Sequence, residues 1–212
     1  MRDNSQLFRG RAVHVIDCEI NSSSITCRVA MSDYAHYLAT TQGAIPPANY
    51  CRSLFVSIVI LTADNYMVFG KMSGQTSSPE KIQCAGGGVS DEHFNRGGEA
   101  DALAAVMQEL AEEMYIDAED KTQVSSLEPI FFKRGGEQEH TGIIYLAETF
   151  LTKGQLLKCF AQKSAKERSG GRLPEFRELV MVRKTAVDAE QFIKENQCSL
   201  ADYMPSLIRE LV

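Results

Sequence analysis

The stretch from Lys81 to Ile116 constrains the fold of this 212-residue chain more than any other part of the sequence. It begins with a short apolar segment, passes through three successive glycines, and ends in a run of residues that favour a helix. Glycines at the end of a strand permit positive φ angles and a close approach of the backbone to a ligand. The stretch therefore predicts a strand, a glycine turn, a loop and a helix, with the rest of the chain supporting this unit.

The helix is predicted over about residues 100–115, because this run lacks Gly and Pro and is rich in good helix formers. Apolar residues recur there at spacings of three and four and form one stripe: Leu103, Val106, Met107, Leu110 and Met114. Beside that stripe lie Glu109, Glu112 and Glu113. Like charges one turn apart destabilise a helix by about 0.2–0.5 kcal/mol, so we expect a cation among them. Carboxylate oxygens suit Mg²⁺ or Mn²⁺.

A solvated acidic face is the simpler explanation of three glutamates on one helix, and it is the better one when the pattern stands alone. A glycine run is likewise often only a turn. Here the glycine turn lies upstream of the acidic helix, and the pair of features favours a site that binds a diphosphate and a divalent metal.

The two features together resemble the Nudix box, in which a glycine and a glutamate precede the pattern R-E-U-x-E-E-x-G-U, where U is apolar. The matching segment is QELAEEMYI at residues 108–116, and the Gly98-Glu99 pair resembles the family's approach to the helix. The resemblance implies an α/β fold, namely a Nudix-like α/β/α sandwich with a mixed β-sheet. It also implies a catalytic site at which Mg²⁺ (or Mn²⁺) is held by Glu109, Glu112 and Glu113.

The resemblance further implies that the substrate lies against the backbone of Gly86, Gly87 and Gly88. The expected reaction is hydrolysis of a diphosphate linkage in a small nucleoside-diphosphate-type molecule. The alternative is a catalytically degenerate Nudix domain that acts as a nucleotide-binding or regulatory module. A third possibility is a structural or interaction protein whose acidic helix is only a solvent-exposed surface. The sequence leaves the identity of the diphosphate and of the general base open.

The segment departs from the family pattern at two main positions. Gln108 stands where the family has Arg, and it can hydrogen-bond a carboxylate but offers no charged fork. Tyr115 stands where the family has a helix-ending Gly, so the helix is expected to continue towards Asp117. In addition, Glu99 lies one residue too far from Gln108, and the loop from Gly88 to Gly98 is longer than usual. Since the three glutamates are kept, a divergent enzyme is favoured over an inactive one.

Composition narrows the class of protein. A net charge of −6 argues against a surface that coats nucleic acid, and the apolar run at 54–61 is too short to span a membrane. The N-terminal residues lack an apolar signal core, and the six cysteines show no CxxC spacing, so we expect reduced thiols and a cytoplasmic protein. The expected partner is a small nucleotide-like substrate, and a homodimer is the default form of self-association.

Two domains are expected, a strand-rich appendage over 1–50 and a Nudix hydrolase domain over 51–212. In the appendage, strands are predicted at 11–20 and 24–31 and a short helix at 32–41. A hairpin of strands 54–61 and 66–71 opens the larger domain. After the acidic helix we expect strands at 127–133, 141–150 and 178–183, and helices at 155–166, 188–195 and 200–211.

Other polar residues are weaker candidates. Arg52 and Lys71 flank the expected hairpin and are able to reach a substrate phosphate, although solvated charge is the simpler explanation of both; only Arg52 is retained as a substrate-binding candidate. Glu137 and Glu139 are candidates for a further metal ligand or base, against the simpler alternative of a polar hairpin tip. The isolated histidines at 14 and 36 are assigned no role.

Overall fold

The computed structural model describes residues 11–22, 24–74, 76, 78–136 and 139–212. Its contacts divide the chain into two compact units, each built from three segments. Unit 1 comprises Met1–Val56, Gly87–Ala105 and Phe132–Ile143, and unit 2 comprises Ser57–Gly86, Val106–Phe131 and Ile144–Val212. None of the described helices is both long and apolar enough to cross a membrane.

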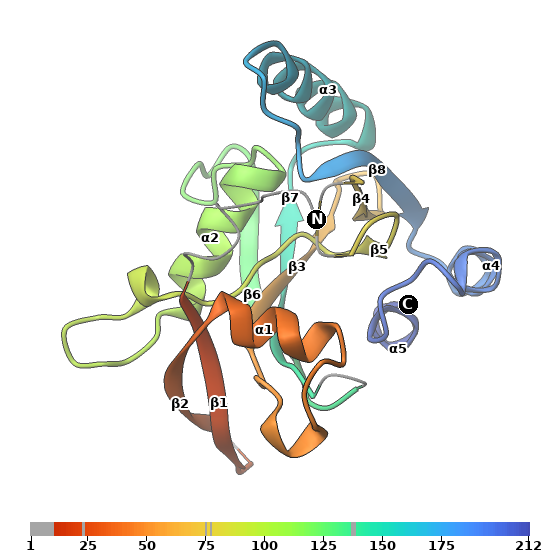
Figure 1. Ribbon diagram of the computed structural model, residues 1–212. Coiled ribbons are helices and arrows are strands. Elements are labelled where there is room, and N and C mark those ends of the chain that lie inside the picture. The colour runs from red at the N-terminus through yellow and green to blue at the C-terminus, as the bar shows by residue number, and fades with distance from the viewer. Residues whose placement is uncertain (1–10, 23, 75, 77, 137–138) are drawn as a thin grey trace. The chain divides into compact units, whose positions relative to one another are not determined.

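The elements follow the predicted order closely (Figure 1). The strands are β1 (Arg11–Ile20), β2 (Ile25–Asp33), β3 (Leu54–Leu61), β4 (Tyr66–Met72), β5 (Ile82–Gln83), β6 (Val124–Lys133), β7 (Thr141–Thr149) and β8 (Phe176–Arg183). The α-helices are α1 (Tyr34–Thr41), α2 (Ala102–Glu113), α3 (Lys153–Ser169), α4 (Ala186–Asn196) and α5 (Met204–Glu210). Two short 3₁₀ turns occupy Pro47–Asn49 and Asp91–His93.

Unit 1 contains the antiparallel hairpin of β1 and β2. The hairpin register places Cys18 directly opposite Cys27, with their Cα atoms 4.1 Å apart, and the two sulfurs form a disulfide. The expectation that all thiols are reduced is therefore wrong for this pair. The four remaining cysteines are free, and two of them, Cys51 and Cys84, are buried. Helix α1 follows the hairpin directly, where the Asp33 carboxylate accepts the backbone N–H of His36.

A six-stranded mixed sheet has the strand order β5-β4-β3-β7-β6, with β8 paired antiparallel to β4. In unit 2 one face of this sheet is covered by α4 and α5. The buried cluster between them is formed by strand and helix side chains that include Val59, Met67, Phe69, Ile144, Val182, Ala189, Ile193, Met204, Leu207 and Ile208.

Strand β3 is buried on both of its faces. Val59 belongs to the cluster beneath α4 and α5, whereas Ile58 and Ile60 point to the opposite face and are fully buried as well. Helix α2 contributes buried Val106 and Leu110 to unit 2. Both faces of the sheet are thus covered, and the expected α/β/α sandwich with a mixed sheet is confirmed.

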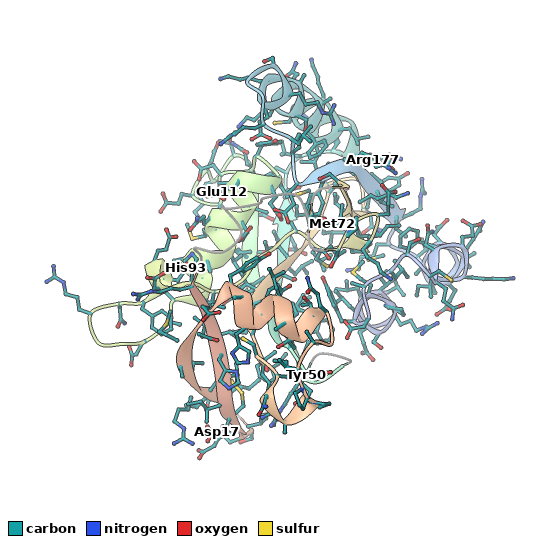
Figure 2. The ribbon with its side chains drawn as sticks, viewed as in Figure 1. Asp17, Tyr50, Met72, His93, Glu112 and Arg177 are labelled. Carbon is teal, nitrogen blue, oxygen red and sulfur yellow. A yellow bond between two sulfur atoms is a disulfide. The ribbon has the colours of Figure 1, made fainter. Side chains whose placement is uncertain are left out.

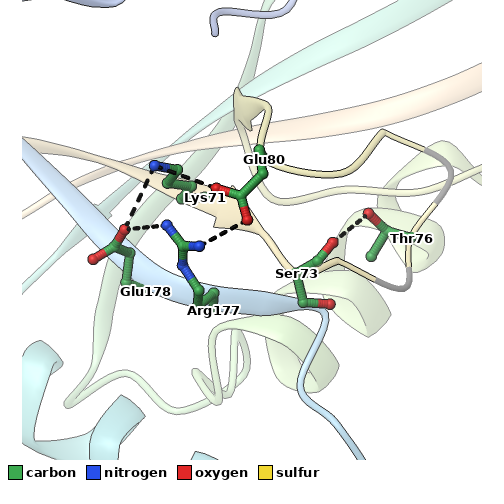
Figure 3. Close-up of polar contacts among 6 residues, drawn as sticks. All are labelled: Lys71, Ser73, Thr76, Glu80, Arg177 and Glu178. Carbon is green, nitrogen blue, oxygen red and sulfur yellow. Dashed lines mark hydrogen bonds and ion pairs between the residues drawn. The ribbon is translucent and has the colours of Figure 1, made fainter.

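A network of four charged side chains joins β4, β8 and the loop before β5 (Figure 3). Lys71 Nζ lies 3.5 Å from Glu80 and 4.0 Å from Glu178. Arg177 completes the network, at 2.7 Å from Glu80 and 3.1 Å from Glu178. Lys71 is therefore held in ion pairs at the sheet. Exposed pairs of this kind contribute about 0–1 kcal/mol each.

Candidate active site

Helix α2 carries the three predicted glutamates, and their exposure differs sharply. Glu113 is only 8% exposed, Glu109 is half-buried, and Glu112 is exposed. Figure 2 labels Glu112 on α2. The apolar stripe beside them is narrower than predicted, because Leu103 is 45% exposed. Burial of Glu113 next to the apolar stripe gives a carboxylate that needs polar partners, since an isolated buried charge is costly.

One partner of Glu113 comes from the glycine turn. The Gly86 N–H donates to Glu113 Oε2 at 2.7 Å. Gly86 has φ of 145°, in the region of positive φ that favours glycine, so the turn depends on this residue type. Within unit 1, the Gly87 carbonyl accepts the Val56 N–H at 2.9 Å and Gly88 forms a bridge with Phe55. Among Gly86, Gly87 and Gly88, it is therefore Gly86 that hydrogen-bonds to the acidic helix.

A fourth carboxylate, Glu175, joins the cluster from the segment before β8. The carboxyl groups of Glu113 and Glu175 share a hydrogen bond. Glu175 was not among the predicted site residues, because it lies far from α2 in the sequence and no local pattern marks it beyond its position between Pro174 and a strand. The pairing of β8 with β4 brings it to the site.

Three of the four carboxylates, those of Glu109, Glu113 and Glu175, have raised pKa values. Burial, followed by the charges of Glu175 and Glu112, raises the pKa of Glu109 to about 7. Burial, followed by the charges of Glu175 and Glu109, raises the pKa of Glu113 well above its ordinary range. Burial also raises the pKa of Glu175. Desolvated like charges of this kind are relieved by a bound cation.

The chemistry of this donor set fits a divalent cation with oxygen ligands. Mg²⁺ takes one or two carboxylates and keeps several waters, so it does not require a complete cage of side chains. In the described part of the chain, no group of three or more His, Cys, Asp or Glu is already arranged around one metal position. Glu109, Glu112 and Glu113 would therefore hold the ion together with water or substrate oxygens.

These carboxylates line a cavity of about 440 Å³ within unit 2. The remaining lining residues come from the end of α2, from α3 and from the segment after α3: Tyr115, Glu167, Arg172, Leu173 and Pro174. The volume falls within the range of pockets that bind small molecules, about 300–1,000 Å³.

Tyr115 ends helix α2. The expectation that the helix continues towards Asp117 is wrong, because α2 stops at Glu113 and Tyr115 adopts φ of 60°. Non-glycine residues in this conformation are destabilised by about 1–2 kcal/mol. Contacts with α3 offset the strain: the Tyr115 hydroxyl donates to Glu167 Oε2 at 2.7 Å, and its ring lies 5.9 Å from that of Phe160. Burial and this hydrogen bond raise the pKa of Tyr115 to about 12.

Gln108, the other departure from the Nudix pattern, contacts the acidic cluster. Its side-chain amide donates to Glu112 Oε1 at 2.9 Å, one turn further along α2. In unit 1, Glu99 accepts a hydrogen bond from the Asn95 amide at 3.1 Å. Gln108 thus orients one of the proposed metal ligands, as a neutral donor rather than as a charged fork.

The other predicted polar residues lie in unit 1. Arg52 Nε is paired with Glu139 Oε2 at 2.6 Å, so each of these two candidates has the other as a partner. The roles of Arg52 in binding substrate and of Glu139 as a ligand or base stay predictions. Glu137 lies outside the described residues. His14 accepts the backbone N–H of Arg52, and His36 contacts Ser32 and the Asn49 carbonyl, so both histidines make structural contacts.

Comparisons with known proteins give similarity of fold. Neither the protein-family models nor the curated proteins contain a match to this chain. The crystal structure of DR0079 from Deinococcus radiodurans is 10% identical, covers 95% of this chain and 98% of its own, and superposes with a TM-score of 0.56.

Two other similar structures are named as Nudix proteins. A NUDIX family hydrolase from Clostridium perfringens is 14% identical, with coverage of 76% of this chain and 95% of its own and a TM-score of 0.44. The NUDIX domain of Shewanella oneidensis NrtR, solved with ADP ribose, is 12% identical, with coverage of 81% and 94% and a TM-score of 0.44. At these identities the likeness concerns the fold alone. The chain thus shares its overall fold with DR0079, with which it superposes over most of its length.

Proposed function

We propose that the protein hydrolyses a diphosphate linkage in a small nucleoside-diphosphate-type substrate and that it requires Mg²⁺ or Mn²⁺. The observation that carries this proposal is the convergence of Glu109, Glu112, Glu113 and Glu175 in one cavity. The three glutamates of α2 are the proposed metal ligands and catalytic residues. Gly86, Gly87 and Gly88 are proposed to place backbone close to the substrate, and Arg52 stays a further candidate for substrate binding.

A divalent ion bound there would neutralise charge on the phosphate oxygens and lower the pKa of a bound water. Gly86 fixes the orientation of the Glu113 carboxylate through its N–H. Gln108 does the same for Glu112. Glu175 enters from a separate segment, so it is able to accept a proton from the attacking water while the ligands on α2 stay in place.

A second candidate function is a degenerate Nudix module that binds a nucleotide without turnover. It is favoured by Gln108, which supplies a neutral donor where the family has an arginine, and by Tyr115, which ends α2 under strain. The intact set of glutamates and the raised pKa of Glu109 favour the enzyme instead.

A hydrolysis panel tests the proposal. Release of phosphate or nucleoside monophosphate is measured with Mg²⁺ and with Mn²⁺, on nucleoside triphosphates, nucleotide sugars, ADP-ribose and dinucleotides. The wild type should be active only with metal, and the Glu112→Gln/Glu113→Gln protein should lose activity by about 100-fold or more. Glu119→Gln is the matched control, since Glu119 is an exposed acid outside the cavity, and it should retain activity.

Two results would count against the hydrolase. Equal activity in the wild type and the double variant would remove the glutamates from catalysis. Inactivity of a folded, metal-loaded wild type across the panel would favour the binding module.

A further inference from the structure

The cavity carries opposite charges in two places. Among the described residues that line it, Arg172 is the one with a positive charge, whereas five are glutamates. Arg172 directly follows the glycine pair that ends α3, and Glu175 comes three residues later. The segment between them therefore links the acidic cluster to a guanidinium along one wall.

The segment between the two charges is short. Pro174 restricts the preceding Leu173 to extended conformations, which disfavours a tight turn between Arg172 and Glu175. Three residues of extended chain span at most about 10 Å. Arg172 and the carboxylates line the same cavity, so one bound substrate is able to contact both.

Arg172 is held by one carboxylate, which is itself held by a tyrosine. Arg172 Nη2 lies 3.0 Å from Glu167 Oε1, and the Tyr115 hydroxyl donates to the other oxygen, Glu167 Oε2, at 2.7 Å. The Arg172 side chain is 78% exposed, whereas that of Glu167 is only 21% exposed. A guanidinium has five N–H donors in a planar fork, so this contact leaves donors for a phosphate.

We propose that Arg172 determines substrate specificity by binding a phosphate next to the diphosphate that is cleaved, with Glu167 and Tyr115 as its positioning residues. The inference rests on the proposed function and narrows its substrate class. Nucleotides that carry an additional phosphate, such as nucleoside triphosphates, should be preferred over nucleoside-diphosphate sugars, which have a neutral sugar in that position. An exposed ion pair with no role in binding would show no dependence on the charge of the substrate.

The test compares two substrates with the same base, a nucleoside triphosphate and a nucleoside-diphosphate sugar, in the presence of Mg²⁺. Arg172→Ala should raise KM for the triphosphate by about tenfold or more, because a charge-assisted contact is lost, with kcat nearly unchanged. Its KM for the sugar nucleotide should stay within about twofold of the wild type. Arg168→Ala is the control, since Arg168 is an exposed arginine of α3 that does not line the cavity.

The positioning residues are tested in the same assay. Tyr115→Phe and Glu167→Gln should each raise KM for the triphosphate by a smaller factor, about three- to tenfold, and leave KM for the sugar nucleotide unchanged. Arg172→Lys should recover part of the affinity, since it restores the charge without the fork. An effect of these variants on both substrates alike would indicate a structural role.

The outcomes separate this inference from the proposed function. If the wild type is active and Arg172→Ala shifts both KM values equally or neither, the inference is overturned and the hydrolase stands. If the wild type hydrolyses neither substrate, the hydrolase fails, and calorimetric titration of the same proteins with both nucleotides decides the inference. Weaker binding of the triphosphate alone by Arg172→Ala supports it, whereas equal binding by variant and wild type, or no binding, overturns it.

Discussion

At the scale of single residues, Glu113 shows what the site requires. Its carboxyl is buried, accepts the Gly86 N–H at 2.7 Å and shares a hydrogen bond with Glu175. Burial and two neighbouring carboxylates raise its pKa, so without a cation the site binds protons instead. The same environment that disfavours the ionised carboxyl in the free protein favours a bound divalent ion.

Glu109 predicts a dependence of stability on pH. Its pKa of about 7 in the folded protein lies above the ordinary 4.5 of the unfolded chain. Its contribution to stability is therefore fully present below about pH 4.5, and it is lost as pH rises through 7. Between pH 5 and pH 8 the unfolding free energy of the wild type should fall relative to Glu109→Gln by about 2 kcal/mol.

Urea unfolding of both proteins at the two pH values measures this difference. Saturating Mg²⁺ should abolish it, because the ion replaces the proton. Parallel pH profiles for the wild type and Glu109→Gln in the absence of metal would contradict the account.

The site residues whose proximity could be predicted are those close together in the sequence. Helical spacing was enough to predict that Glu109, Glu112 and Glu113 lie together. Glu175 could not be found in this way, because only the pairing of β8 with β4 brings its segment to the cavity. The predicted end of α2 near Asp117 was also wrong. The contact of Tyr115 with Glu167 of α3 offsets the local preference against positive φ, and the helix stops at Glu113.

At the scale of elements, the pairing of β4 with β8 positions Glu175. The ring of Phe176 lies directly over Gly70, and a Cβ atom at Gly70 would lie 2.2 Å from Phe176 Cδ1. The absence of a side chain at Gly70 therefore permits the close packing of the residue that follows Glu175.

Gly70→Ala should destabilise the protein by about 1–3 kcal/mol, because the buried Phe176 ring must move. The same movement should displace Glu175 and lower hydrolytic activity. Gly74→Ala is the matched control, since a Cβ there meets nothing within 4 Å, and it should change stability by about 0.5 kcal/mol or less. Equal unfolding free energies for the two variants in urea would contradict this packing.

Element order was predictable because hydrophobic periodicity and turn residues are local signals. The disulfide of Cys18 and Cys27 was missed, because it depends on the hairpin register, which pairs Ile20 with Ile25 and so places Cys18 opposite Cys27. Cysteine spacing was considered without strand register, and the register supplies the missing information.

At the scale of the whole molecule, the α/β/α sandwich was predictable from one motif and the succession of elements. The proposed boundary between an appendage over 1–50 and a hydrolase domain over 51–212 stays a prediction. Each compact unit is assembled from three chain segments, and a division of this kind depends on tertiary contacts that local composition does not report.

The central claim is that the acidic cavity of unit 2 binds a divalent ion, and a titration with Mn²⁺ tests it without knowledge of the substrate. Paramagnetic resonance of free Mn²⁺ gives the affinity and the number of sites. The wild type should bind Mn²⁺ at this cavity. Glu113→Gln should lower the affinity by about tenfold or more, whereas Glu119→Gln should match the wild type. Failure of the wild type to bind, or equal affinity in Glu113→Gln, would contradict the account.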